Sequence, residues 1–155
     1  MDEEKRLETI YKNQVIKKNK IPKKDKAPKP WTKEEMWLEK EFIDWYKQQN
    51  KVCSYCGITE DDLKYIFDNN KEVLPSARSV TRGRHFEIDR KLDKKGYYAE
   101  NCCLACYWCN NAKSDCFTDK QFKPIGKVMG DIIRKIIDVN KKGKNNNCNI
   151  NKIYL

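Results

Sequence analysis

The sequence predicts a small α+β fold in which two short strands and a helix are clamped at cysteine pairs and flanked by further helices. Three observations predict it. Residues 85–90, "HFEIDR", alternate apolar and polar side chains as a half-buried strand does. Gly96 breaks the chain before a second short strand at 102–105, and "WCNNAKSD" then begins a short helix. Cys-x-x-Cys pairs lie outside these elements, so the order strand, turn, strand, helix is typical of a ββα unit clamped by a metal ion.

The chain before residue 31 predicts a basic N-terminal arm. Residues 1–20 are expected to form a charged, weakly amphipathic helix with Leu7, Ile10 and Tyr11 on one side. Residues 20–30 alternate Lys with Pro, which excludes a stable helix or a central strand and predicts an extended basic linker. We therefore expect residues 1–30 to form the arm and linker, 31–140 the folded domain, and 141–155 a disordered Lys/Asn-rich tail.

Two helices are expected on the N-terminal side of the ββα unit. The first begins at Thr32, whose side chain caps it, and Glu35 completes a capping box. "VCSYCG" then predicts a tight knuckle, Thr59 caps the second helix, and residues 68–83 are expected to form a long loop with a basic end. The apolar residues of the first helix recur mainly at helical spacing: Trp31, Met36, Leu38, Phe42, Trp45 and Tyr46.

The last predicted helix runs from Thr118 to about Asn140 and is bent or interrupted near Pro124. It carries more apolar residues than one buried face needs. Either the excess packs on the domain or it contacts a second copy of the chain, and core packing is the favoured alternative. The apolar residues are Phe122, Ile125, Val128, Met129, Ile132, Ile133, Ile136 and Ile137.

Composition narrows the class of partner. The 155 residues carry a formal net charge of +10, which favours a polyanion, and nucleic acid is the commonest one. No apolar run approaches the roughly 20 residues that a transmembrane helix needs, and the first residues lack the apolar core of a signal peptide. We therefore expect an intracellular protein without a membrane partner, in a compartment where thiols stay reduced. In that setting the eight cysteines are interpreted as metal ligands before disulfides.

Four of the cysteines have the spacing of a zinc site. Cys53 and Cys56 form one Cys-x-x-Cys turn, and Cys106 and Cys109 form the other, so two distant stretches together offer four thiolates to one tetrahedral Zn²⁺. Such a structural zinc couples metal binding to the folding of a small domain. The alternative, a catalytic redox pair, lacks its βαβ context. The remaining cysteines follow no pattern: Cys102 and Cys103 on the second strand, one of them expected in the core, Cys116, expected to be buried, and Cys148 in the tail.

The segments "EIDRKLDKKGYYAEN" and "CYWCNNAK" together resemble the HNH, or ββα-metal, nuclease family. The usual pattern of that family is Asp-His on the first strand, a middle Asn, and then Cys-x-x-Cys-Asn-x-x-Lys. The resemblance covers about residues 31–138 and is closest to the zinc-bound "IDR…GY…CxxCN" subgroup, which includes a rare-cutting restriction endonuclease. It implies a zinc-stapled ββα-metal core that hydrolyses phosphodiester bonds in DNA.

The resemblance assigns roles to particular residues. Asp89 and Asn110 would bind the catalytic divalent cation, Mg²⁺ or Mn²⁺. Arg90 stands where the general-base His of the family stands. Since an arginine cannot accept a proton at neutral pH, its expected role is to hold a phosphate oxygen. The base would then be the tyrosine of the Gly-Tyr pair, Tyr97. A free phenol has a pKa near 10, and both the cation and Arg90 would favour its ionised form.

Four residues in or near this motif have alternative interpretations. Tyr97 is alternatively a packing residue of the turn, and Tyr98 beside it can take either place. Asn101 matches the middle Asn of the family, which holds the loop between the strands by backbone hydrogen bonds. Lys113 either meets a DNA phosphate or is solvated. His85 lies on the order of 13 Å from the metal-binding carboxylate along the strand, so it is expected to contact DNA or solvent and not to act as the base.

The resemblance further implies products with a 5′-phosphate and a 3′-hydroxyl, and a symmetric homodimer for a double-strand break. One departure limits this inference. The restriction endonuclease of the subgroup has a second zinc motif near its N-terminus, whereas this chain has no cysteine before Cys53, so the target sequence does not carry over. Two alternatives stay open, a zinc-dependent DNA-binding module without nuclease activity and a zinc-bearing RNA-binding protein. The joint presence of Asp89, Tyr97 and Asn110 favours the enzyme.

Overall fold

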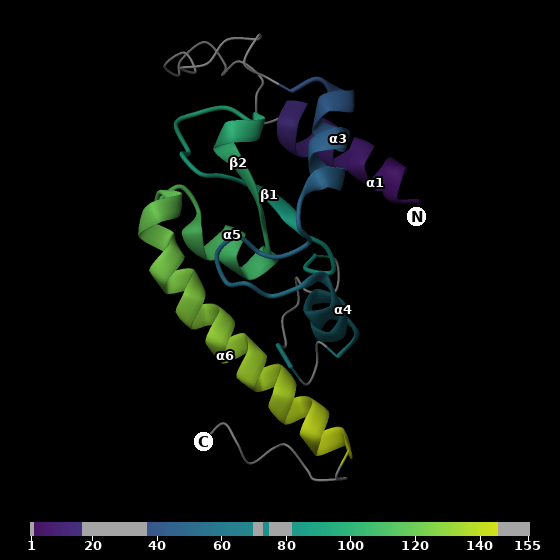
Figure 1. The fold of residues 1–155 in the computed structure, drawn as a ribbon, viewed down its shortest axis with the longest axis vertical. Coiled ribbons are helices and arrows are strands. Elements are labelled where there is room, and N and C mark those ends of the chain that lie inside the picture. Colours follow the sequence, from purple (N-terminus) through teal and green to yellow (C-terminus); the bar gives the residue numbers. More distant parts are fainter. Residues whose placement is uncertain (1, 17–36, 70–72, 75–81, 146–155) are drawn as a thin grey trace. The chain divides into compact units, whose positions relative to one another are not determined.

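The computed structural model describes residues 2–16, 37–69, 73–74 and 82–145, and within them the α+β class is confirmed (Figure 1). The chain forms two compact units. The first comprises Met1–Asn50 with Ile88–Leu104, and the second comprises Lys51–Glu87 with Ala105–Leu155. The elements in chain order are α1 (Glu3–Ile10), η1 (Tyr11–Ile16), α3 (Glu39–Gln48), α4 (Glu60–Asp68), β1 (Glu87–Arg90), η4 (Ala99–Asn101), β2 (Cys102–Ala105), α5 (Tyr107–Lys113) and α6 (Asp119–Asn145).

The first unit is built on the packing of α1 against α3, the purple and blue helices of Figure 1. The expected N-terminal helix is α1, which continues through the wider π-helical turns of η1. Arg6 is buried over the ring of Tyr46, 5.2 Å from its centroid, and donates to the Tyr46 hydroxyl at 3.3 Å and 3.4 Å. The Tyr11 hydroxyl donates to the carbonyl of Trp37 at 3.0 Å. Residues 2–16 therefore pack on α3, and on Trp37 just before it, through the side chains of Arg6 and Tyr11.

Helix α3 begins later than the sequence predicts. Its N-cap is Leu38, in extended conformation, and its first helical residue is Glu39. Leu38 has no polar side chain, so the capping interaction comes from Glu41, whose carboxylate accepts from the Leu38 N–H at 3.0 Å. Trp37 lies before the helix and packs on Trp45, with ring centroids 4.7 Å apart. The predicted cap at Thr32 and Glu35 lies outside the described residues, as do Trp31 and Met36.

Strands β1 and β2 form a two-stranded antiparallel sheet, and the boundary between the two units crosses both strands. Strand β2 has the predicted bounds, whereas β1 begins at Glu87, two residues after the predicted start. Glu87 and Asp89, the two carboxylates of β1, are only 8% and 6% exposed. Buried carboxylates are costly unless they are paired or bind a metal, so the polar face of β1 is a candidate for function.

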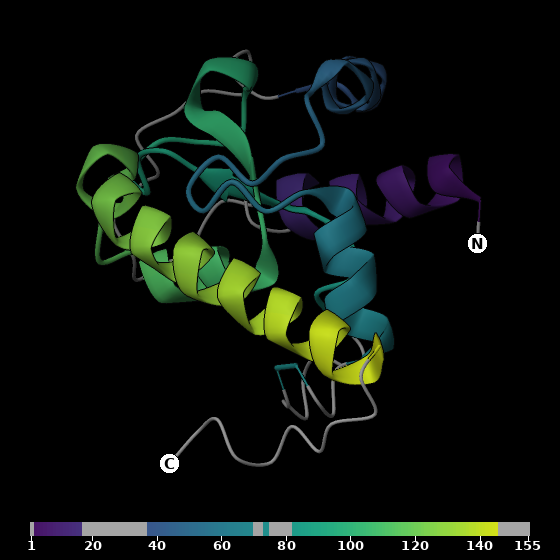
Figure 2. The ribbon, with the colours of Figure 1, turned by 60° about the horizontal axis from the view of Figure 1, so that its bottom comes forward.

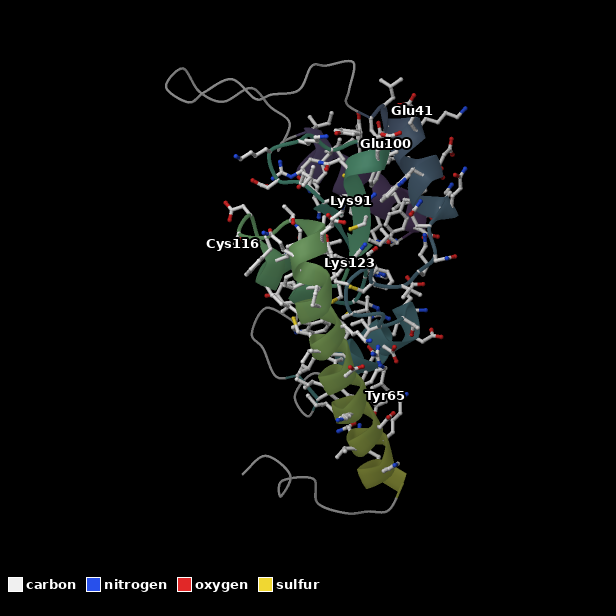
Figure 3. All side chains as sticks on the ribbon, turned by 60° about the vertical axis from the view of Figure 1, so that its left-hand side comes forward. Glu41, Tyr65, Lys91, Glu100, Cys116 and Lys123 are labelled. Carbon is white, nitrogen blue, oxygen red and sulfur yellow. The ribbon has the colours of Figure 1, made fainter. Side chains whose placement is uncertain are left out.

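The second unit is organised along α6, the long green-to-yellow helix of Figures 1 and 2, which contacts α4 and α5. Thr118 caps it by accepting from the Gln121 N–H at 3.3 Å, and Pro124 lies inside the helix without interrupting it. The helix continues through Asn145, so residues 141–145 of the expected disordered tail are helical, and the rest lies outside the described residues. Near its far end, Asn140 accepts from the hydroxyl of Tyr65 of α4 at 2.6 Å; Tyr65 is labelled in Figure 3.

Two glycines let α6 lie against the backbone of the cysteine knuckle. A Cβ at Gly130 would lie 2.0 Å from the carbonyl oxygen of Cys56, and a Cβ at Gly126 would lie 2.6 Å from Cβ of Tyr55. One turn further along, Arg134 donates to the same Cys56 carbonyl at 2.9 Å. The knuckle is therefore held by α6 as well as by its own turn.

The apolar residues of α6 form two groups, because the helix carries more of them than one buried face can hold. Phe122, Ile133 and Ile137 are buried, which confirms core packing for that group. Ile125, Val128 and Ile132 are exposed. None of the described helices is both long enough and apolar enough to cross a membrane.

Candidate functional site

The four paired cysteines meet in one buried cluster in the second unit. Cys53 and Cys56 come from the knuckle, Cys106 is the N-cap of α5, and Cys109 lies in its first turn. Their Sγ atoms all lie within 4.8 Å of one another, and those of Cys56 and Cys106 are 3.6 Å apart. Thiolates bound to Zn²⁺ at about 2.3 Å in a tetrahedron are about 3.8 Å apart, so the donor set and its spacing fit zinc. The four cysteines that were predicted to meet therefore do so, in a cluster that could hold a zinc ion.

Backbone groups support this cluster. The N–H of Cys106 points at Sγ of Cys53, and the N–H of Cys109 points at Sγ of Cys106, both at 3.3 Å. Hydrogen bonds from the thiols of Cys106, Cys109 and Cys56 hold the pKa of Cys53 well below its usual value. The same contacts, together with burial, raise the pKa of Cys106, so the cluster shares its protons unequally among the four sulfur atoms.

The other described cysteines stay outside the cluster. Cys102 and Cys103 are both buried on β2, where one core residue was expected, and burial raises the pKa of the Cys102 thiol. The expectation of a buried Cys116 is wrong, since this residue is exposed in the turn before α6, as its label in Figure 3 shows. Cys148 lies outside the described residues.

In the first unit, Arg90 is held by the loop that follows β1. Its Nη2 donates to Oδ1 of Asp93, its Nη1 donates to the carbonyl of Lys95 at 3.3 Å, and its guanidinium lies 5.0 Å from the ring centroid of Tyr97. Asp93 was not among the residues predicted for the site. Its carboxylate pairs with Arg90, so the guanidinium that was expected to hold a phosphate oxygen is already oriented and partly neutralised.

Tyr97 lies on the buried side of this loop and is 2% exposed, whereas Tyr98 is half-buried. Burial raises the pKa of Tyr97 well above its usual value, and Arg90 lowers it by a smaller amount. The expected influence of Arg90 thus has the right sign, but burial outweighs it. In the protein without a bound cation, Tyr97 is therefore a neutral phenol at neutral pH.

Asn101 joins the two ends of the same loop. Its Nδ2 donates to the carbonyls of Leu92 and Gly96 at 3.1 Å and 2.9 Å, and its Oδ1 accepts from the Leu92 N–H at 3.0 Å. The side chain is 3% exposed, and its backbone carbonyl accepts from the N–H of Lys91 at 2.6 Å. Lys91 in turn donates through Nζ to the carbonyl of Glu100 at 2.8 Å, a pair labelled in Figure 3. Both ends of the Asn101 amide are therefore used on the backbone.

In the second unit, Asn110 has a partner that the sequence analysis missed. Its Nδ2 donates to Oε2 of Glu87 at 2.6 Å. The other oxygen of Glu87, Oε1, accepts from Nε and Nη2 of Arg82 at 2.9 Å and 2.6 Å, and Arg82 lies 4.8 Å from the ring centroid of Tyr107. One signal could have found Glu87: it stands two residues before Asp89, so both side chains leave the same face of β1.

Lys113 and His85, for which a DNA contact was expected, lie in different surroundings from each other. Lys113 is 1% exposed, and its Nζ lies 3.5 Å from the carbonyl of Ser114. A contact with a DNA phosphate, and equally a solvated position, does not fit a side chain buried to that extent. His85 is partly exposed, with Nδ1 3.8 Å from Oε1 of Glu60, which fits the expected surface position.

Comparisons with known proteins give one solved structure that is similar to this chain. It is described as the rare-cutting HNH restriction endonuclease PacI, with 27% sequence identity over 62% of this chain and 63% of that chain, and a TM-score of 0.47. The match thus spans less than two thirds of PacI. No protein-family model matches the chain, and no curated protein matches it.

Proposed function

We propose that this protein is a zinc-stabilised, divalent-metal-dependent DNA endonuclease of the ββα-metal type. One observation carries the proposal: four buried cysteines converge at the start of α5 with the geometry of a zinc site, and the residue that follows the last of them is Asn110. This arrangement supports the HNH resemblance, in which the last zinc cysteine directly precedes a metal-binding Asn. The net charge of +10 suits a DNA substrate.

We propose Asp89 and Asn110 as ligands of the catalytic cation. A carboxylate oxygen and an amide oxygen are donors that Mg²⁺ and Mn²⁺ accept. Asp89 is 6% exposed on β1, the strand on which the HNH resemblance expects the metal-binding carboxylate. When bound, a divalent cation stabilises negative charge on the scissile phosphate and on the leaving oxygen. Asp89 belongs to the first unit and Asn110 to the second.

Arg90 and Tyr97 would contact the reacting groups themselves, which are the scissile phosphate and the attacking water. Arg90 would hold a nonbridging phosphate oxygen, and its contacts with Asp93 and the carbonyl of Lys95 orient its guanidinium. Tyr97 would accept a proton from the attacking water through its phenolic oxygen. Tyr97 would act as this base only after it had passed its own proton to solvent water, a loss that burial opposes and that Arg90 and a bound cation would favour. Water attack at phosphorus with loss of the 3′ oxygen leaves a 5′-phosphate and a 3′-hydroxyl.

A restriction-type enzyme that cuts both strands would use two copies of this site. The exposed apolar residues of α6, Ile125, Val128 and Ile132, are the surface that we would test for self-association. Sedimentation equilibrium of the wild-type chain and of a Val128→Lys variant checks this part of the proposal separately from cleavage.

The test of function is incubation of the zinc-loaded protein with supercoiled plasmid and Mg²⁺ or Mn²⁺, with sequencing of the ends produced. Cleavage that requires the divalent cation and is lost in an Asp89→Ala variant of unchanged zinc content is the expected result. DNA binding without cleavage at any cation concentration would favour the alternative, a zinc-dependent DNA-binding module. Preferential binding of RNA would favour the third interpretation.

A further inference from the structure

Glu87 is a buried carboxylate with a complete set of partners. It is 8% exposed, Arg82 donates twice to its Oε1, and Asn110 donates to its Oε2 at 2.6 Å. The resemblance to the nuclease family assigned it no role. Its position two residues before Asp89 and its contact with Asn110 connect it to both proposed ligands of the cation.

The contact fixes which end of the Asn110 side chain faces Glu87. A carboxylate only accepts hydrogen bonds, so the amide must turn its NH₂ group toward Glu87. Its carbonyl oxygen then points to the opposite side. An asparagine binds a metal through that oxygen, so Glu87 presents the correct atom of Asn110.

Arg82 determines which carboxylate oxygen of Glu87 faces Asn110. An arginine only donates hydrogen bonds, and its two donors at 2.6 Å and 2.9 Å occupy Oε1 of Glu87. The remaining oxygen, Oε2, is left for Asn110. Stacking of Arg82 on the ring of Tyr107, 4.8 Å from its centroid, anchors the far end of this chain of contacts to α5 itself.

We propose that Glu87 is a positioning residue that orients the Asn110 amide toward the catalytic cation. This inference rests on the proposed function, in which Asn110 is a metal ligand. It extends that function by a carboxylate that acts through Asn110, with Arg82 as its own support. Partners of metal ligands typically change metal affinity by about 10–100-fold when they are removed.

The hydrogen-bond polarity provides a test with a distinctive result. In a Glu87→Gln variant, the introduced carbonyl must face Arg82, so the introduced NH₂ group faces Asn110. The Asn110 amide then turns its oxygen inward and its NH₂ group toward the cation. In an Asn110→Asp variant, the oxygen that replaces the NH₂ group lies against Oε2 of Glu87, and this repulsion should turn the side chain away from the position that Asn110 occupies. In the double variant, the introduced aspartate accepts from the introduced NH₂ group, and its second oxygen again points toward the cation.

The measurement is Mn²⁺ binding to the zinc-loaded protein by calorimetry, without DNA, after zinc content and circular dichroism show that each variant is folded. We expect each single variant to bind Mn²⁺ about 10–100-fold more weakly than wild type and the double variant to regain most of that loss. A residue that only stabilises the fold would give additive losses instead. Wild-type affinity in Glu87→Gln, or additive effects of the two substitutions in the double variant, would overturn the inference.

A second measurement needs no variant. In the metal-free wild-type protein, NMR should detect a scalar coupling across the hydrogen bond between ¹⁵Nδ2 of Asn110 and ¹³Cδ of Glu87, and absence of this coupling in a sharp, assigned spectrum would overturn the inference. Failure of the proposed function gives another pattern, because Asp89→Ala and Asn110→Ala would then leave Mn²⁺ binding unchanged. Failure of the Glu87 inference alone leaves those two variants impaired.

Discussion

The loop between β1 and β2, residues 91–101, and the start of α5, residues 106–110, are each organised around an asparagine, but in opposite ways. Asn101 uses both ends of its amide on the loop backbone, at Leu92 and Gly96. Asn110 uses only its NH₂ end, on the carboxylate of Glu87. The comparison teaches that the partners of an amide, and not its residue type, distinguish a structural asparagine from a candidate ligand.

The two regions also differ in the interactions that hold them together. The start of α5 is held by the cysteine cluster, which is a possible zinc site. The loop is closed by hydrogen bonds and by the stacking of Arg90 on Tyr97. Changes at the cysteines should therefore affect folding, whereas changes in the loop should separate stability from catalysis.

The largest expected effect is at the cluster. Cys106→Ser should abolish tight zinc binding and unfold the second unit, because Cys106 is both a ligand and the N-cap of α5. Elemental analysis and thermal unfolding measure the two effects. The control is Cys116→Ser, since Cys116 is exposed and outside the cluster. Folded wild-type protein without zinc would show that the cluster is not a zinc site.

The second prediction separates Tyr97 from its neighbour. Tyr97→Phe keeps the buried ring and should reduce plasmid cleavage by roughly 10²–10⁴, the range for loss of a general base, with zinc content and DNA binding unchanged. Tyr98→Phe is the matched control and should cut at close to the wild-type rate. Excess Mn²⁺ should partly rescue Asp89→Ala and should not rescue Tyr97→Phe. Wild-type cleavage by Tyr97→Phe would make this residue a packing residue of the loop.

The third prediction compares alanine substitutions at the two asparagines. Asn101→Ala should destabilise the protein by about 1–3 kcal/mol for each buried backbone group left unpaired, because three loop hydrogen bonds are lost. Asn110→Ala loses a single side-chain hydrogen bond, to Glu87, so it should lower the free energy of unfolding by less than Asn101→Ala while it removes Mn²⁺ binding. Equal loss of stability in the two variants would contradict the difference between the two regions.

The smallest expected effect is on alkaline stability. The pKa of Tyr97 is higher in the folded than in the unfolded protein, so the folded state holds this proton more tightly. The resulting stabilisation is fully present below the ordinary tyrosine pKa near 10 and is lost as pH rises through and above it. The free energy of unfolding in urea, measured between pH 8 and pH 11, should therefore fall less steeply with pH for Tyr97→Phe than for wild type. Tyr11, whose pKa burial also raises, contributes equally to both proteins and cancels in the difference.

Much of the local structure could be predicted from the sequence. The bounds of β2, the Thr59 and Thr118 caps and the two separate Cys-x-x-Cys turns follow from short-range patterns of neighbouring residues. The predicted start of α3 failed because Trp37 packs on Trp45 before the helix, with Leu38 extended at the cap. Tertiary packing overrides a local helix signal in such a place.

For the candidate site, the sequence by itself determined the chemical types: two Cys-x-x-Cys turns, an Asp-Arg, a Gly-Tyr and an Asn after the last cysteine. Spacing along the chain is sufficient for these, because each motif is a few residues long. Only the tertiary structure decided how buried the residues are and which side chains meet across long separations. Burial raises the pKa of Tyr97 and removes Lys113 from solvent, and folding brings Glu87 to Asn110. Desolvation and contacts between distant residues arise from the packed chain, so no local pattern contains them.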